Sequence, residues 1–541
     1  MRIWLAYKSH LAGASDPFTS LLPVGLCTIN ATLRKAGYAS RLANLSSLDE
    51  NKIVSLLRDD QPALVGLSMF THNRRETRDL VRLVKSILPD CCVVLGGPHA
   101  TQRWQQLLGM TPEIDAIAIG EGEATMLELA STLERGGSDL TSIAGLAARS
   151  GGMSSQPVMR LPLMDLDGIP FAGMYVDDAI GVDPRSQLEF LISSRGCPAA
   201  CRFCSSPGFW GRSLRFRSPS SLVDEIGYLR DRFGLIYFSI RDDTFTADRH
   251  RVIDFCDRLL EKRIFILWTC QSRVNAVDSE MLRMMKKAGC ECLQLGVESG
   301  SIRVLKGLGK AITPLQVKNA AEAVHEAGIS LSIYLIAGSP DENDADVQDS
   351  LDLIAAISPE DGQVSPLVYY PGTELFDSAV RTGAVPSDLF ESDDSILLPV
   401  RRDRFVARAT RRLMAALQKS GEGSCVNREA GIASLKERLG YCHATNLLAG
   451  EVYAGQGSLS RAEREYREIT EREPDNPWGW LALGELLGES GRLDEAIKAF
   501  LRLSTLVPAH LPAYVALGEL SSLQGNHRAA EGYLLKAESL R

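Results

Sequence analysis

Hydrophobic residues in the first 150 positions form short runs separated by longer stretches with helical periodicity. Helical patterns cover 23–36, 74–88 and 123–134, and the apolar runs between such patterns predict β-strands. The predicted strands are Ile3–Tyr7, Ser40–Leu45, Ala63–Phe70, Cys92–Leu95 and Ile114–Ile119. Because strands and helices alternate at this period, the pattern predicts an α/β domain over 1–150, with a doubly wound, Rossmann-like parallel sheet.

The same alternation resumes at residue 188. The stretch before it, 151–187, is rich in Gly, Ser, Pro and Asp, which predicts a linker. Six strand–helix units over 188–380 predict an incomplete (β/α)6 barrel of the TIM type. Its predicted strands are Leu188–Ser193, Leu235–Ile240, Ile264–Cys270, Cys292–Val297, Ser330–Ala337 and Gln363–Tyr370.

A period of 34 residues marks the end of the chain. Ala462, Ala496 and Ala530 follow this step, and Trp480 and Leu483 fall on the tetratricopeptide (TPR) pattern. The pattern predicts an all-α TPR solenoid over 443–541, preceded by a helical connector over 381–442. Such solenoids commonly bind proteins, so we expect a protein, peptide or carrier-bound substrate or partner there; packing against the barrel and dimerisation are alternatives.

Composition narrows the possible functions. The net charge is −9 and the pI is about 5.6, so no basic surface argues for nucleic acid. No apolar run approaches the roughly 18 residues of a membrane-spanning helix. The chain has 12 cysteines and its first residues do not form a secretory signal, which favours a reducing, cytoplasmic location.

Three cysteines carry the most specific chemical signal. Cys197, Cys201 and Cys204 have the spacing C-x3-C-x2-C in a loop after the first predicted barrel strand. Three thiolates can hold three irons of a 4Fe–4S cluster and leave the fourth iron open to a substrate. The alternatives are a zinc site, which normally needs four ligands, and incidental buried thiols.

This spacing, with an aromatic residue at Phe203, resembles that of radical S-adenosylmethionine (radical SAM) enzymes. The resemblance implies that the open iron binds the amino and carboxylate groups of S-adenosylmethionine, which the reduced cluster cleaves to a 5′-deoxyadenosyl radical. It also implies an electron donor of the flavodoxin or ferredoxin type.

The other predicted S-adenosylmethionine contacts lie at strand ends, on the rim where barrels of this type place their chemistry. The usual Gly-Gly-Glu run is absent, and Asp341 replaces a glycine in the run 338–342, which leaves that loop's geometry open. The predicted contacts are Asp242, Asp243, Arg273, Glu298, Ser299 and Gly338.

Glycine-rich turns follow two strands of the first domain, at Gly96–His99 and Gly120–Glu123. With 22–26 and 65–68 they resemble the cobalamin-binding domain found before the radical SAM barrel in one large subclass; a flavodoxin-like domain without ligand is the alternative. The resemblance implies cobalamin contacts at Pro23, Gly25, Ser68, Gly96, Gly97, Pro98, His99, Gly120, Glu121, Gly122 and Glu123.

The cobalt's axial ligand is not identified by the sequence. The Asp-x-His-x-x-Gly run of cobalamin-dependent mutases is absent, so we expect His99 to line the site without binding cobalt. His72, in a loop over 70–73 expected to face the lower side of cobalt, is the alternative ligand, although a surface position is favoured.

The two resemblances together imply a cobalamin-dependent radical SAM enzyme, most simply a methyltransferase acting on an unactivated carbon. A non-methylating enzyme of the same architecture is the first alternative: a tetrapyrrole cyclase, a ring-contracting oxidase or a sulfur-inserting enzyme. The second alternative is an inactive binding protein that acts through its TPR repeats.

Overall fold

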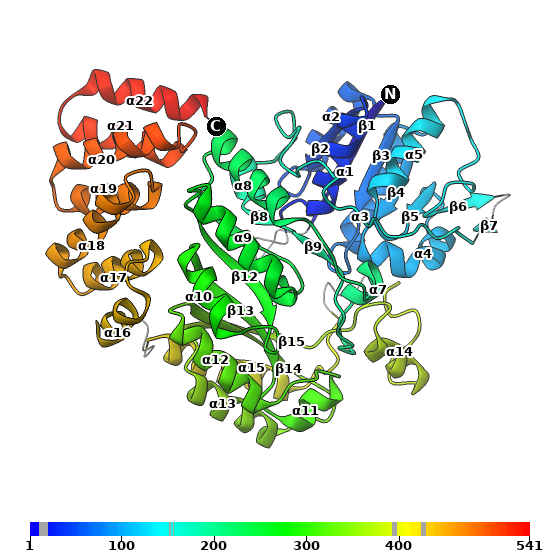
Figure 1. Ribbon diagram of the computed structural model, residues 1–541. Helices are drawn as coiled ribbons and strands as arrows, with labels where there is room; N and C mark the ends of the chain where they lie inside the picture. The colour runs from blue at the N-terminus through cyan, green and yellow to red at the C-terminus, as the bar shows by residue number, and fades with distance from the viewer. Residues whose placement is uncertain (10–19, 151–152, 155, 392–397, 423–428, 541) are drawn as a thin grey trace.

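The computed structural model describes the whole chain except residues 10–19, 151–152, 155, 392–397, 423–428 and 541. An amino-terminal α/β domain and a carboxyl-terminal helical array lie on opposite sides of a central barrel-like sheet (Figure 1). The fold class predicted from the sequence is confirmed for all three parts.

The amino-terminal sheet has the strand order β2-β1-β3-β4-β5-β6-β7. The first five strands are parallel, and β6 and β7 add an antiparallel edge that the sequence analysis did not predict. The strands are β1 (Arg2–Tyr7), β2 (Ala39–Asn44), β3 (Leu64–Ser68), β4 (Cys92–Gly96), β5 (Ala116–Ala118), β6 (Leu146–Ser150) and β7 (Met153–Ser154).

Helices cover both faces of this sheet. Along β1, Ile3 and Leu5 pack in one core with α1 and α5, whereas Trp4 and Ala6 pack in a second core with α2, α3 and α4. Since successive side chains of a strand point to opposite faces, a continuous apolar strand fits a sheet buried on both sides. The helices are α1 (Val24–Lys35), α2 (Glu50–Asp60), α3 (Arg74–Ile87), α4 (Pro98–Met110) and α5 (Glu123–Glu134).

The central sheet has six parallel strands in the order β15-β14-β13-β12-β11-β8. The strands are β8 (Phe190–Leu191), β11 (Tyr237–Ile240), β12 (Leu267–Arg273), β13 (Cys290–Glu298), β14 (Ser330–Ala337) and β15 (Asp361–Pro366). The intervening helices are α8 (Pro219–Phe233), α9 (Arg249–Glu261), α10 (Ser279–Lys287), α12 (Pro314–Glu326) and α13 (Asp344–Ile357). The prediction of an incomplete six-unit barrel is confirmed.

The first barrel strand is shorter than the predicted 188–193. A helix, α6 (Pro184–Leu188), precedes it, because Asp183 caps that helix through the backbone N–H of Arg185 and Pro184 occupies the first turn. The last strand is also displaced, from the predicted 363–370 to 361–366.

Three helical hairpins follow the barrel and the helices α14 (Glu374–Arg381), α15 (Arg404–Glu422) and α16 (Glu429–Leu439). A Cβ atom at Gly450 would lie 2.1 Å from Tyr466, so the glycine allows the paired helices to approach closely. The hairpin helices are α17 (His443–Gly455), α18 (Leu459–Arg472), α19 (Pro477–Glu489), α20 (Leu493–Leu506), α21 (Leu511–Leu523) and α22 (His527–Ser539).

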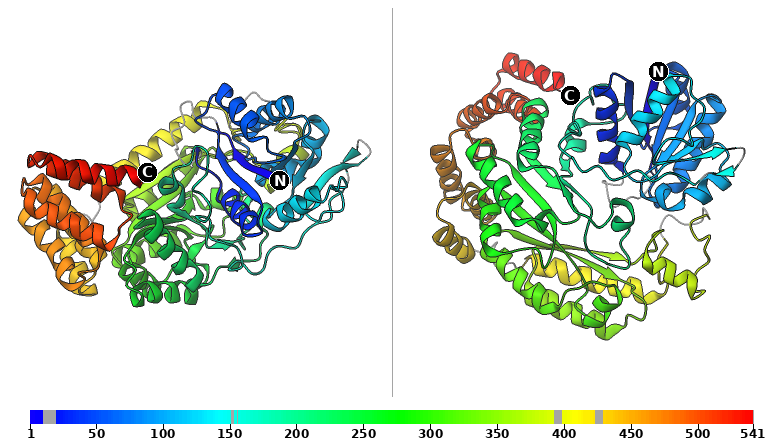
Figure 2. Two further views of the ribbon diagram at one scale, coloured as in Figure 1. Left: turned by 90° about the horizontal axis from the view of Figure 1, so that it is seen from above. Right: turned by 45° about the vertical axis from the view of Figure 1, so that its right-hand side comes forward.

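The helical hairpins pack against the amino ends of the barrel strands. The rings of His443 and Phe265 are 5.5 Å apart, the Cys442 thiol lies 3.6 Å from the carbonyl of Lys286, and Gly234 packs on Ala509. Figures 1 and 2 show this array and the amino-terminal domain at opposite sides of the barrel. None of the helices in the described ranges combines the length and apolarity that a bilayer crossing requires.

Candidate active site

The three cysteines lie in a hairpin that follows β8. Two short antiparallel strands, β9 (Ser194–Arg195) and β10 (Arg215–Phe216), form its base, and a short helix, α7 (Ser206–Trp210), lies within it. Cys197, Cys201 and Cys204 all line one cavity of about 350 Å³ at the carboxyl ends of the barrel strands. The structure therefore brings the three predicted cluster ligands to one site.

The residues at this site fit an iron–sulfur cluster. Nη1 of Arg273 lies 3.8 Å from the Cys201 sulfur, where its charge favours a thiolate. Burial raises the pKa of the Cys204 thiol to about 11, so metal binding at this position has to displace a tightly held proton. Among the described residues, no three His, Cys, Asp or Glu side chains converge closely enough to hold a single metal ion.

Three of the predicted S-adenosylmethionine contacts line the same cavity: Asp243, Arg273 and Glu298. Asp243 accepts a hydrogen bond from the Ser206 hydroxyl, and burial raises the pKa of its carboxyl. The cavity thus presents carboxylates and a guanidinium beside the thiols, which is the charge pattern that an amino acid's ammonium and carboxylate require.

Sequence reasoning missed a cation and three polar side chains in this cavity. Lys310 donates to Glu298 at 2.8 Å, and Glu298 has the left-handed φ of +70° that is uncommon outside glycine. Gln271, Gln294 and Tyr334 come from three neighbouring strands, and the Tyr334 hydroxyl donates to Gln294 at 3.0 Å.

Asp242 does not line the cavity. Its carboxylate is buried and accepts from the N–H of Ser193 at 2.6 Å, from the N–H of Ser194 at 3.0 Å and from the Ser193 hydroxyl. These bonds fix the chain between β8 and β9, so Asp242 holds the start of the cysteine hairpin.

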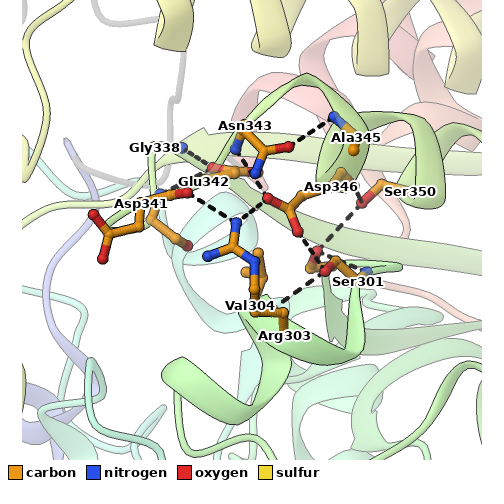
Figure 3. Close-up of polar contacts among 12 residues, drawn as sticks. Ser301, Arg303, Val304, Gly338, Asp341, Glu342, Asn343, Ala345, Asp346 and Ser350 are labelled. Carbon is orange, nitrogen blue, oxygen red and sulfur yellow. Dashed lines mark hydrogen bonds and ion pairs between the residues drawn. The ribbon is translucent and has the colours of Figure 1, made fainter.

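Ser299 and Gly338 also lie outside the cavity lining. The Ser299 hydroxyl is buried 3.3 Å from that of Ser350, and the Gly338 N–H donates to the carboxylate of Glu342 at 2.6 Å. Figure 3 shows how Asp346 joins the loop after β13 to the loop after β14. Its carboxylate accepts from the Ser301 hydroxyl of the first loop and from the Asn343 N–H of the second.

In the loop 338–342, Asp341 replaces the glycine of the family pattern, yet the backbone keeps a conformation typical of glycine. Asp341 has φ +59°, a left-handed conformation that Asp tolerates better than most residues. Its carbonyl accepts from Arg303 at 2.8 Å, and the neighbouring Glu342 accepts from the N–H groups of Gly338 and Ser339 (Figure 3). The replacement therefore preserves the turn.

A second cavity, of about 280 Å³ and mostly apolar, opens at the carboxyl ends of the amino-terminal strands. A Cβ atom at Gly25 or Gly120 would meet no heavy atom within 4 Å, so both glycines border open space suited to a bulky ligand. Ten of the eleven predicted cobalamin contacts line it: Pro23, Gly25, Ser68, Gly96, Gly97, Pro98, Gly120, Glu121, Gly122 and Glu123.

The exception is His99. It is buried 3.1 Å from the Thr71 hydroxyl and edge-on to Phe390, and burial lowers its pKa to about 3. His72 lies 2.9 Å from the Tyr7 hydroxyl and stacks on Phe70; of this loop only Phe70 lines the cavity. Within the described chain, no histidine lines this cavity.

Helix α7 separates the two cavities. Pro207 lines the cavity of the cysteines, whereas Phe209 and Trp210 line the apolar cavity. Gln102 of α4 donates to the Gly208 carbonyl at 2.6 Å and so attaches this helix to the amino-terminal domain. The two sites are neighbours across about one turn of helix.

Family models match three separate parts of the chain. Residues 17–130 match the B12 binding domain, residues 191–354 match the radical SAM superfamily, and residues 447–510 and 481–540 match the tetratricopeptide repeat.

Two relatives are similar to about two thirds of the chain. An uncharacterized methyltransferase of Pyrococcus horikoshii is 30% identical over 363 residues, which cover 66% of this chain and 78% of the relative. An anaerobic magnesium-protoporphyrin IX monomethyl ester cyclase of Rubrivivax gelatinosus is 27% identical, covering 70% and 69%. In fold, the cobalamin-dependent S-adenosylmethionine radical enzyme OxsB with aqua-cobalamin bound has a TM-score of 0.61 and 17% identity, covering 99% of this chain and 84% of OxsB.

The fold and the cysteine hairpin define a radical SAM enzyme. With its amino-terminal domain, the chain belongs to the cobalamin-binding radical SAM family, whose cofactors are a 4Fe–4S cluster, S-adenosylmethionine and cobalamin.

Proposed function

We propose that this enzyme is a methyltransferase that acts on an unactivated carbon. The observation that carries the proposal is that α7 borders both cavities, since Pro207 lines one of them and Phe209 and Trp210 line the other. When bound, the cluster and S-adenosylmethionine supply a 5′-deoxyadenosyl radical and cobalamin supplies a methyl group. A substrate at the edge of α7 would be within reach of both.

We assign roles to the side chains of the cysteine cavity by charge. Cys197, Cys201 and Cys204 hold the cluster, Arg273 and Lys310 face the carboxylate of S-adenosylmethionine, and Asp243 and Glu298 face its ammonium. Asp242, Ser299 and Gly338 act indirectly, by holding the loops that carry these groups.

We assign the apolar cavity to cobalamin. Gly25 and Gly120 leave room for the ring system, and Val24, Ile29 and Met126 exclude water from it. The partners that we propose are a flavodoxin- or ferredoxin-type electron donor and a protein that binds the TPR array. Because the array packs at the amino ends of the barrel strands, such a partner would bind away from the cysteine cavity. We also propose a cytoplasmic location, where reducing conditions suit the cluster.

The named function of the Pyrococcus relative favours methylation, and that of the Rubrivivax relative supports ring cyclisation as a second candidate. Anaerobic incubation with methyl-labelled S-adenosylmethionine, a reductant and host extract separates them. Methylation transfers label to a product that is one CH2 heavier and releases 5′-deoxyadenosine. Formation of 5′-deoxyadenosine with no labelled product would reject the methyltransferase and favour the second candidate.

A further inference from the structure

The strands at the base of the cysteine hairpin carry two buried arginines. Arg195 of β9 and Arg215 of β10 are paired in register, and their side chains are only 8% and 2% exposed. Cys197 follows Arg195 by two residues. The place of Arg195 in the molecule therefore fixes where the first thiol lies.

Both arginines bind the glycine-rich turn after β5, in the other domain. Arg195 pairs with Glu121 at 2.9 Å and with Glu123 at 2.6 Å, and Arg215 pairs with Glu121 at 2.5 Å. Both glutamates line the apolar cavity assigned to cobalamin. Four buried charges thus connect the wall of one cavity to the strands that carry the ligands of the other.

The network leaves its carboxylates well satisfied. Glu123 also accepts from the Thr28 hydroxyl at 2.8 Å, and Glu121 accepts from the N–H of Leu163 at 3.2 Å. Burial opposes ionisation of Glu123, but the Arg195 guanidinium outweighs it and lowers the pKa of that carboxyl. Arg195 also stacks over Trp210, with 5.0 Å to the ring centroid, and Trp210 lines the same apolar cavity.

Such a network fixes the relative position of its side chains more than it raises the free energy of unfolding. Replacing a buried ion pair by well-packed apolar side chains is often neutral or stabilising, whereas a guanidinium that binds two carboxylates fixes distance and angle. Reacting groups depend on that geometry, because an error of about 1 Å can cost about 100-fold in rate.

We propose that Glu121, Glu123, Arg195 and Arg215 are positioning residues that set the distance between the iron–sulfur cluster and the cobalt. The inference rests on the proposed function, in that it needs both cofactors in the two cavities. None of the four residues needs to touch the reacting atoms for this role.

The test compares two variants with a matched control in the reconstituted full-length protein. Arg215 lines neither cavity, and Arg215→Gln removes one cationic partner of Glu121. Glu123→Gln removes the charge of the second carboxylate that Arg195 binds. The control, Glu225→Gln, removes the carboxylate charge of a similarly buried pair with Arg217, in which both residues belong to the barrel part; Glu225 also accepts from the N–H of Ala172 in the linker. The readouts are iron and corrinoid content, and the distance between the reduced cluster and cob(II)alamin from pulsed EPR.

We expect both variants to retain the two cofactors. Their distance distribution should shift or broaden beyond that of the wild type and of Glu225→Gln, and turnover should fall by about 10- to 100-fold. Cofactor-loaded variants with the distance distribution and turnover of the control would overturn the positioning role. Wild-type protein that binds iron and no corrinoid would instead overturn the proposed function, and the positioning role with it.

Discussion

The Nζ atom of Lys310 lies 2.8 Å from Oε1 of Glu298, and both residues line the cavity that the three cluster cysteines line. The pair is almost fully buried, with side chains 5% and 10% exposed. The pair thus brings a cation and an anion into the cavity of the three thiols, where we propose that S-adenosylmethionine binds.

Lys310→Met should weaken S-adenosylmethionine binding. The change removes a cation for the cofactor's carboxylate and leaves Glu298 as an unpaired buried charge, so we expect the dissociation constant to rise about 10-fold or more. Equilibrium dialysis with the reconstituted protein measures it. Lys262→Met, which breaks an exposed pair with Asp224, is the control. Equal affinities of the Lys310 variant and the wild type would contradict the role.

Gly25→Leu should remove cobalamin without unfolding the protein. A side chain at this position projects into the open cavity, where it competes with the ligand. Gly109→Leu is the matched control, because Gly109 is an exposed helical glycine with equally open space outside the cavity. Corrinoid content after reconstitution should fall in the first variant only, while both keep their iron. Full corrinoid loading of Gly25→Leu would show that cobalamin does not bind here.

Asp341 should tolerate glycine or asparagine and reject valine. Its φ of +59° costs a β-branched residue about 1–2 kcal/mol, whereas Gly and Asn adopt it readily. Thermal unfolding should therefore occur at a lower temperature in Asp341→Val than in Asp341→Gly. If all three variants unfold alike, the left-handed turn that Glu342 caps is not required.

The contact between the helical array and the barrel should weaken in mild acid. Burial and Lys286 hold the pKa of His443 near 4, below its ordinary value of 6.5, although Glu473 lies 3.5 Å from Nδ1. The unfolded chain therefore binds the proton first, and stability falls by up to about 3 kcal/mol as the pH drops from about 6.5 to 4.

His443→Gln should flatten this dependence when unfolding by urea is followed between pH 7 and pH 4. The exposed His527→Gln is the control and should keep the wild-type slope. A wild-type slope in His443→Gln would assign the acid sensitivity to other groups.

The sequence predicted the architecture because its signals are local. Apolar runs alternating with helical periods predict parallel sheets, and Gly450 and Gly484 repeat at the TPR spacing. The sequence analysis missed one such local signal at Asp183 and Pro184. A capping residue followed by proline marks the start of a helix, but the linker 151–187 was predicted to lead directly into a strand.

Side-chain direction explains the site residues that sequence reasoning misplaced. Asp242 and Asp243 are adjacent, so they point to different sides, and only Asp243 lines the cavity. Gln271, Gln294 and Tyr334 lie in strands that hold other polar residues, so the sequence does not single them out, and their convergence depends on strand register. Lys310 lies 12 residues after Glu298, beyond α11 (Ile302–Gly307), and only the fold brings the two together.

The most direct test of the account is Mössbauer spectroscopy of protein reconstituted anaerobically with iron-57 and sulfide. We predict a 4Fe–4S signal in the wild type and in the control Cys290→Ala/Cys292→Ala, and a change in that signal when S-adenosylmethionine is added. The signal should be absent from Cys197→Ala/Cys201→Ala/Cys204→Ala. A wild type without this signal, or a triple variant that keeps it, would contradict the central claim.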